Sequence, residues 1–98
     1  MASKLISEDI QTSLQQLHAD WSLNSNSDTI QRIFNFDNYY QTIAFTNSVA
    51  WIAHQKNHHP DMLITYNTCR IEFSTHSVNG LSELDFICAT ATDLLITH

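Results

Sequence analysis

The sequence predicts an α+β fold, αββαββα, in which a four-stranded antiparallel sheet carries three helices on one face. Two observations lead to this prediction. Apolar residues recur at helical spacing in three stretches, and they alternate with polar residues in four shorter stretches between them. No repeat, linker or low-complexity tract interrupts the 98 residues. We therefore expect a single domain over residues 1–98.

The first third of the chain predicts a helix followed by a β-hairpin. Ser7 is expected to cap a helix over about residues 7–18. Its apolar face comprises Ile10, Leu14 and Leu17. The strands are expected at 21–23 and 30–36, on either side of a polar turn. Arg32 interrupts the alternation of the second strand, and we expect its long side chain at a sheet edge.

A long central helix is predicted from about Asn38 to Asn57, with Asp37 as its cap. Its expected buried stripe comprises Tyr39, Ile43, Val49, Ala50 and Ala53. Further apolar residues lie beyond this stripe, namely Phe45, Trp51 and Ile52. Because one small sheet does not need so much apolar surface, we expect part of the helix to pack against another subunit.

A second hairpin is predicted from strands at 63–66 and 69–76 that are joined at Asn67-Thr68. The second strand is expected to place Cys69, Ile71 and Phe73 on the helix-covered face, and Arg70, Glu72, Ser74 and His76 on the polar face. If the loop has two residues, Tyr66 lies opposite Cys69 and His59 lies opposite His76. The histidines of two distant stretches would then meet.

A final helix is expected after the turn at Asn79-Gly80. Ser82 followed by Asp85 has the spacing of a capping box. The expected apolar stripe of this helix comprises Leu84, Ile87, Cys88, Ala91, Leu94 and Leu95. This helix completes the αββαββα order.

The composition excludes several classes of function. The formal charge is −6, and the four Lys and Arg residues are scattered, so direct binding of nucleic acid is not expected. Gly80 is the one glycine, so no glycine-rich loop for ATP, NAD or FAD can form, and chemistry with these cofactors is not expected. Cys69 and Cys88 are expected to be free thiols in a reduced cytoplasm. No apolar run reaches the roughly 18 residues of a membrane span, and no signal-peptide core is present, so we expect a soluble cytoplasmic protein without membrane contact.

Three histidines occur in the seven residues from His54 to Pro60. His54 and His58 share one helix face, and Pro60 ends the helix. Such a cluster can bind a metal, exchange protons or be an ordinary polar helix end. Metal binding is weakly indicated, because no Glu follows the first His as in zinc proteases and no Cys is near. For any single histidine the ordinary role is favoured, and it is expected for His18 and His98, which lie outside the cluster.

The combined pattern resembles the pterin-4a-carbinolamine dehydratase family. The resemblance rests on His54-x-x-x-His58-His59-Pro60, then Tyr66, Ser74-Thr75-His76 and Gly80-Leu81-Ser82-Glu83-x-Asp85, together with Trp21 and the Phe34-x-Phe36-Asp37 stretch. It implies an αββαββα fold, oligomers built from dimers, and dehydration of 4a-hydroxytetrahydropterin to quinonoid dihydropterin without metal or cofactor. This reaction would serve tetrahydrobiopterin recycling for an aromatic amino acid hydroxylase. Some members also dock onto the dimerisation helices of a transcription factor.

The resemblance also implies roles for individual residues. The active-site histidines of the family correspond to His58, His59 and His76. His54 stands where many members have an acidic residue that supports the first of them, and Met62 replaces an aromatic residue. Further candidates for substrate binding or support are Ser74, Thr75 and Asp85, of which Asp85 is equally expected to be the helix-capping partner of Ser82.

Overall fold

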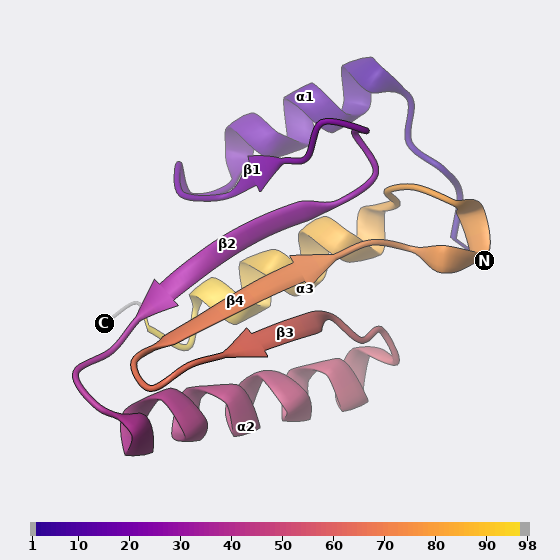
Figure 1. Ribbon diagram of the computed structural model, residues 1–98. Coiled ribbons are helices and arrows are strands. Elements are labelled where there is room, and N and C mark those ends of the chain that lie inside the picture. Colours follow the sequence, from indigo (N-terminus) through magenta and orange to yellow (C-terminus); the bar gives the residue numbers. More distant parts are fainter. Residues whose placement is uncertain (1, 97–98) are drawn as a thin grey trace.

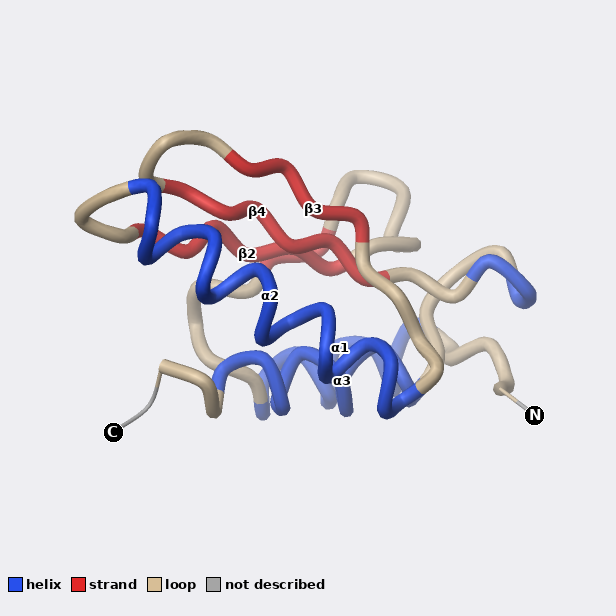
Figure 2. Tube along the Cα trace, turned by 90° about the horizontal axis from the view of Figure 1, so that it is seen from below, coloured by secondary structure: helices blue, strands red, loops and turns tan. Residues whose placement is uncertain are grey.

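The computed structural model describes residues 2–96, which form one antiparallel sheet with helices on one face. In chain order the elements are α1 (Ser7–Gln16), β1 (Ser22–Leu23), β2 (Ile30–Asn35), α2 (Tyr39–Lys56), β3 (Asp61–Ile64), β4 (Thr68–Phe73), the 3₁₀ turn η1 (His76–Val78) and α3 (Glu83–Asp93). The strand order is β1-β2-β4-β3 (Figure 1). Seen from below, the helices lie together on one side of the strands (Figure 2). The predicted fold class is confirmed, and no helix among the described residues is long and apolar enough to cross a membrane.

The core lies between the sheet and the helices, because alternate residues of the central strands point the same way. In β4 the side chains of Cys69, Ile71 and Phe73 are buried, as predicted. In β2 the side chains of Ile30 and Phe34 are buried as well. The helices contribute Phe45, Val49, Phe86, Cys88 and Ala89 to this core. Each fully buried apolar side chain of this size stabilises a fold by about 1.5–3 kcal/mol.

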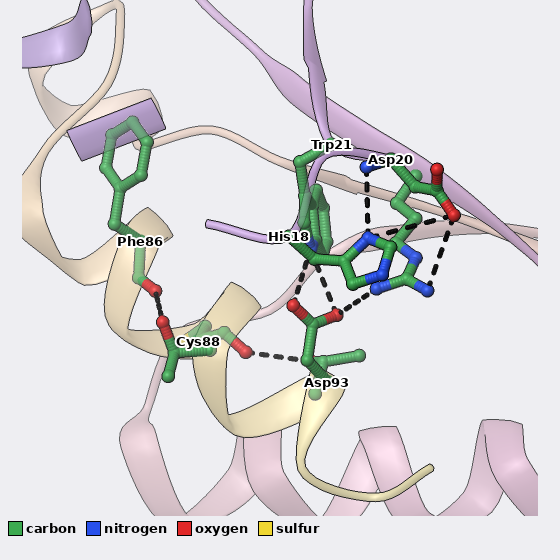
Figure 3. Close-up of polar contacts among 9 residues, drawn as sticks. His18, Asp20, Trp21, Phe86, Cys88 and Asp93 are labelled. Atoms are coloured by element: carbon green, nitrogen blue, oxygen red, sulfur yellow. Dashed lines mark hydrogen bonds and ion pairs between the residues drawn. The ribbon is translucent and has the colours of Figure 1, made fainter. Parts of the chain in front are cut away.

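Arg32 lies on the core side of β2, where its side chain is buried instead of extending from a sheet edge as expected. Its side chain is only 9% exposed, and Nη1 lies 2.8 Å from Oδ1 of Asp93 at the end of α3. Indole Nε1 of Trp21 donates to the same carboxylate at 3.0 Å, as Figure 3 shows. The guanidinium also lies 4.4 Å from the ring centre of Phe34. A buried charge requires such a partner, and here it comes from 61 residues further along the chain.

The beginnings of the first two helices differ from the prediction. The residue that precedes α1 is Ile6, which makes no side-chain cap, so Ser7 is the first helical residue. The cap of α2 is Asn38 rather than Asp37, and its Oδ1 accepts the backbone N–H of Gln41 at 2.9 Å. Because Asp and Asn both cap well, their order in the chain does not reveal which of them does so.

The buried stripe of α2 is rotated relative to the prediction. Val49 and Ala53 are buried as expected, but Tyr39 is 53% exposed. The helix instead buries Thr42, Phe45 and Thr46. A threonine can be buried here because its hydroxyl finds backbone acceptors, as that of Thr42 does at Asn38 (2.9 Å) and at Tyr66 (3.0 Å).

In α3 the predicted capping box of Ser82 and Asp85 is confirmed. The predicted stripe is correct for Cys88, but Ile87 and Leu94 are 43% and 67% exposed. The buried side of the helix carries Asp85, Phe86, Cys88, Ala89 and Thr92. Because Asp85 points inward, the residues three, four and seven positions later share its face.

The β3–β4 register is two residues away from the predicted one. Ile64, and not Tyr66, lies opposite Cys69. The turn spans Thr65–Thr68, since the N–H of Thr65 donates to the carbonyl of Thr68 at 2.9 Å. Regular pairing ends at Asp61 and Glu72, so the predicted pairing of His59 with His76 is wrong. His76 instead begins η1, and His98 lies outside the described residues.

Candidate active site

His58 is held where α2 ends. The helix stops at Asn57, whose backbone is left-handed (φ 51°), and the N–H of His58 donates back to the carbonyl of Ala53 at 3.1 Å. The His58 ring stacks on Phe73 of β4 with a centroid distance of 6.2 Å and an interplanar angle of 12°. Its Nε2 lies 2.6 Å from Oδ1 of Asp85, and the side chain is only 11% exposed. The imidazole is therefore fixed on two sides.

The Asp85 carboxylate is completely buried and holds three segments together. Its Oδ2 accepts the backbone N–H of Ser82 at 2.9 Å and the hydroxyl of Thr75 at 2.8 Å. The hydroxyls of Thr75 and Ser82 are themselves 2.7 Å apart. Buried carboxylates need such donors and a cationic or N–H partner. Asp85 thus connects the exit of α2, the segment after β4 and the start of α3.

His76 lies in a polar cavity next to this group. The cavity has a volume of about 320 Å³ and is lined by Asp28, Thr29, Asp61, Ser74, Thr75, His76, Asn79 and Gly80. Thr75 belongs both to this cavity and to the Asp85 group. A larger cavity of about 430 Å³ lies between the N-terminal segment and α3, but no imidazole lines it. Because only the smaller of these two cavities is lined by an imidazole, it is the better candidate for a site of acid–base chemistry.

The other two histidines of the stretch lie outside the hydrogen-bonded group. His59 is exposed and makes no hydrogen bond within residues 2–96. His54 is also exposed, and its ring stacks on Trp51 at 5.7 Å. The acidic support of His58 thus comes from Asp85 rather than from the position of His54. Among the described residues, no three His, Cys, Asp or Glu side chains are arranged to hold a metal ion.

Sequence reasoning missed the contact between His58 and Asp85, which are 27 residues apart. Asp85 occupies the third position of a helix that begins with a capping box, and this local role explains its identity without a histidine. The contact of the Ser82 hydroxyl with Thr75 and the position of Asp61 at the cavity were missed as well. The family pattern, which includes Asp85, is the one signal in the sequence that points to the pair.

The fold and the site together define a small α+β protein in which a buried carboxylate is paired with a half-buried imidazole and is linked through Thr75 to a polar cavity. The sequence profile of the family described as pterin 4 alpha carbinolamine dehydratase matches residues 3–95. A protein of Nitrosomonas eutropha, named as a candidate pterin-4-alpha-carbinolamine dehydratase, is 53% identical over 91% of this chain and 77% of its own length. A Legionella pneumophila protein named in the same way is 46% identical over 98% of this chain and 85% of its own. The chain therefore belongs to the pterin 4 alpha carbinolamine dehydratase family.

A solved structure supports the fold independently. The crystal structure of a transcriptional coactivator/pterin dehydratase from Brucella melitensis superposes with a TM-score of 0.91 and is 26% identical in sequence. The match covers 97% of this chain and all of the Brucella chain. The three helices and the antiparallel sheet of the present chain therefore have the arrangement of the pterin dehydratase fold.

Proposed function

We propose that this protein dehydrates 4a-hydroxytetrahydropterin to quinonoid dihydropterin and water. The observation that carries the proposal is the His58–Asp85 pair, with a separation of 2.6 Å, beside the cavity that His76 lines. Family membership and the names of the relatives support the same reaction. In this proposal the reaction serves the recycling of tetrahydrobiopterin for an aromatic amino acid hydroxylase.

The reaction requires two proton transfers at neighbouring atoms of the pterin. The C4a–O bond breaks as the hydroxyl receives a proton and leaves as water. N5 loses its proton, and its electron pair forms the new C4a=N5 double bond. Two imidazoles in opposite protonation states can carry out both transfers. No metal or cofactor takes part in this scheme.

The proposed roles follow from how firmly each side chain is held. His58, with its buried carboxylate partner, is the principal acid–base group at the 4a-hydroxyl. His76 is the second acid–base group, on the other side of the ring. His59 is exposed and makes no hydrogen bond within residues 2–96, so it chiefly binds and orients the pterin. Ser74 at the cavity wall is assigned to the amide-like edge of the ring.

The proposal is tested by following carbinolamine decay with purified protein, before and after treatment with a chelator and with its zinc content measured. Acceleration that persists in zinc-free protein supports histidine catalysis. Acceleration that disappears with the metal supports the metal alternative instead. Because the uncatalysed decay also proceeds, each trace is compared with buffer alone.

A second candidate function is the binding of an amphipathic helix from a partner protein such as a transcription factor. The observation that favours it is the description of the Brucella relative as a transcriptional coactivator as well as a dehydratase. The surface would lie on α2, where Trp51 is 60% exposed and Ile52 is half-buried. Phe45 was expected to be part of this surface but is buried in the core. Helix binding that survives replacement of His58 would support this role, whereas self-association through α2 would compete with it.

A further inference from the structure

The hydrogen bonds around Asp85 run in one direction. The backbone N–H of Ser82 can only donate, so Oδ2 of Asp85 is its acceptor at 2.9 Å. Thr75 donates its hydroxyl hydrogen to the same oxygen at 2.8 Å. A threonine hydroxyl has one hydrogen, so the 2.7 Å contact between the hydroxyls of Ser82 and Thr75 must be a donation from Ser82. The chain of donors therefore runs from Ser82 through Thr75 to Asp85.

This direction determines what Asp85 offers to His58. Two donors converge on Oδ2, and such donors favour the ionised carboxylate, which can only accept. Its other oxygen, Oδ1, lies 2.6 Å from Nε2 of His58. Nε2 must then carry a hydrogen and donate it. Because a neutral imidazole has one N–H, the lone pair of His58 is left on Nδ1.

Nδ1 of His58 is free to react. It makes no hydrogen bond within residues 2–96. Within the same residues, Arg32 Nε is a buried side-chain atom without a hydrogen-bond partner, but Nδ1 of His58 is not. Nδ1 has no partner and is not buried, so it is in contact with solvent. The atom that holds the lone pair is thus the accessible one.

We infer that Ser82, Thr75 and Asp85 are positioning residues that hold His58 in the Nε2–H tautomer, so that Nδ1 is the atom that exchanges a proton with the substrate. The tautomer follows from the hydrogen bonds alone. The role of Nδ1 in proton transfer rests on the proposed dehydratase function. Thr75 acts in this arrangement through Asp85, and its hydroxyl hydrogen is not available to bind the pterin.

The tautomer is measured by ¹⁵N–¹H correlation spectra of the side-chain nitrogens in the full-length, ligand-free protein, at a pH where the His58 ring is neutral. We expect a pyrrole-type shift for Nε2 and a pyridine-type shift for Nδ1. The opposite pair of shifts would overturn the inference. The His58→Gln variant assigns the signals, because it removes one set of them.

Asp85→Asn gives a sharp second test. Ser82 N–H and the Thr75 hydroxyl both donate to the Oδ2 position, so the amide oxygen must occupy it and the amide NH₂ must face His58. Nε2 then becomes an acceptor, and the ring changes to the Nδ1–H tautomer. We expect reversed nitrogen shifts and a loss of kcat within the range of about 10²–10⁴-fold for a general acid–base group. Asp9→Asn, in the exposed first turn of α1, is the matched control and should change neither. Unreversed shifts in folded Asp85→Asn would overturn the inference.

Thr75 supplies a test that does not depend on the folding of Asp85→Asn. Thr75→Val keeps the shape of the side chain but removes the donor, whereas Thr75→Ser keeps the hydroxyl. Loss of one hydrogen bond to a charged group changes an equilibrium constant roughly tenfold or more. We therefore expect Thr75→Val to lower kcat about tenfold with KM unchanged. Thr75→Ser should restore kcat. A rise in KM with unchanged kcat would mean that Thr75 binds substrate and would overturn its positioning role. If wild-type protein shows no dehydratase activity, the proposed function fails, while the tautomer is still decided by the nitrogen shifts.

Discussion

Nε2 of His58 lies 2.6 Å from Oδ1 of Asp85, and this contact joins the exit of α2 to the first turn of α3. The ring is clamped between that carboxylate and the face of Phe73. A general acid–base group needs a fixed orientation and a defined protonation state. The contact supplies the fixed orientation, and Thr75, which donates to Asp85, also lines the polar cavity where a second histidine, His76, is found.

The two other histidines that we propose for the active site, His59 and His76, are predicted to differ in their kinetic effects. His76→Ala should lower kcat by about 10²–10⁴-fold, because it removes a group that transfers a proton. His59→Ala should mainly raise KM, because His59 is expected to bind the ring. Steady-state kinetics of carbinolamine decay separate the two. His18→Ala, an exposed histidine beside Asp20, is the control, and a loss of kcat there would show that the assay reports general damage.

His54→Glu should keep or raise the activity. The position is exposed and its ring stacks on Trp51, while Asp85 is already the carboxylate partner of His58. A glutamate there adds negative charge near the helix exit without removing a contact of the reacting group. Turnover is measured beside wild type and His54→Gln, which changes the side chain without adding charge. A large loss of rate in the Glu variant alone would contradict this account of His54.

The alternation of β4 could be predicted from the sequence because Cys69, Ile71 and Phe73 obey the period of two that any half-covered strand must show. The register could not, because it depends on the turn: Thr65 and Thr68 close it with side-chain and backbone bonds that the Asn67-Thr68 pair does not reveal. The local pattern therefore predicts the strand, but the residues with which it pairs are known only from the structure.

Buried polar residues were the other source of error. Arg32 was expected at a sheet edge because it interrupts the alternation of its strand, and the sequence gives no sign of its partner Asp93, which lies 61 residues further along the chain. Thr42 and Thr46 were not expected in the stripe of α2, although threonine hydroxyls can bond the preceding turn of their own helix, as that of Thr46 does at the Thr42 carbonyl (2.8 Å). At the site, the family pattern indicated Asp85, but only the fold shows that it contacts His58.

Removal of one partner of the Arg32–Asp93 pair should destabilise the protein strongly. Asp93→Ala leaves the Arg32 guanidinium buried without its closest carboxylate, which typically costs about 3–5 kcal/mol. Asp20, whose carboxylate is 64% exposed and 3.6 Å from Nη2 of Arg32, is the matched control. Its replacement by Ala should cost about 1 kcal/mol or less. Urea unfolding of both variants measures the difference, and equal losses would contradict the assigned importance of the buried pair.

Cys88 should make the protein less stable at alkaline pH. Burial, helped by the charge of Asp85, raises the pKa of this thiol from 9.0 to about 11. Above pH 9 the unfolded chain loses the thiol proton while the folded chain keeps it, so the free energy of unfolding falls as the pH rises from 9 to about 11. The stability that the raised pKa provides is therefore complete below pH 9.

Cys88→Ala isolates this effect from other groups that titrate in the same range. The slope of unfolding free energy against pH should be smaller in the variant than in wild type between pH 9 and about 11. Denaturant titrations at several pH values measure both slopes. Parallel curves would show that Cys88 ionises equally in the folded and unfolded states.

Self-association is predicted to use the exposed side of α2. Tyr40 and Trp51 are 82% and 60% exposed there, which is a high exposure for aromatic rings. Light scattering should give the mass of a dimer or tetramer for wild type. Trp51→Glu should shift it towards the monomer, whereas Ile33→Glu, on the helix-free face of the sheet, should not. A monomeric wild-type mass would contradict the prediction.

The most direct test compares the decay of 4a-hydroxytetrahydropterin with equal concentrations of wild-type protein and His58→Ala. We predict that wild type accelerates the decay well above the buffer rate, and that the variant, if folded, loses about 10²–10⁴-fold of that catalysis. Equal acceleration by the two proteins would contradict the role assigned to the His58–Asp85 pair. A wild-type rate equal to that of buffer would contradict the proposed dehydratase function itself.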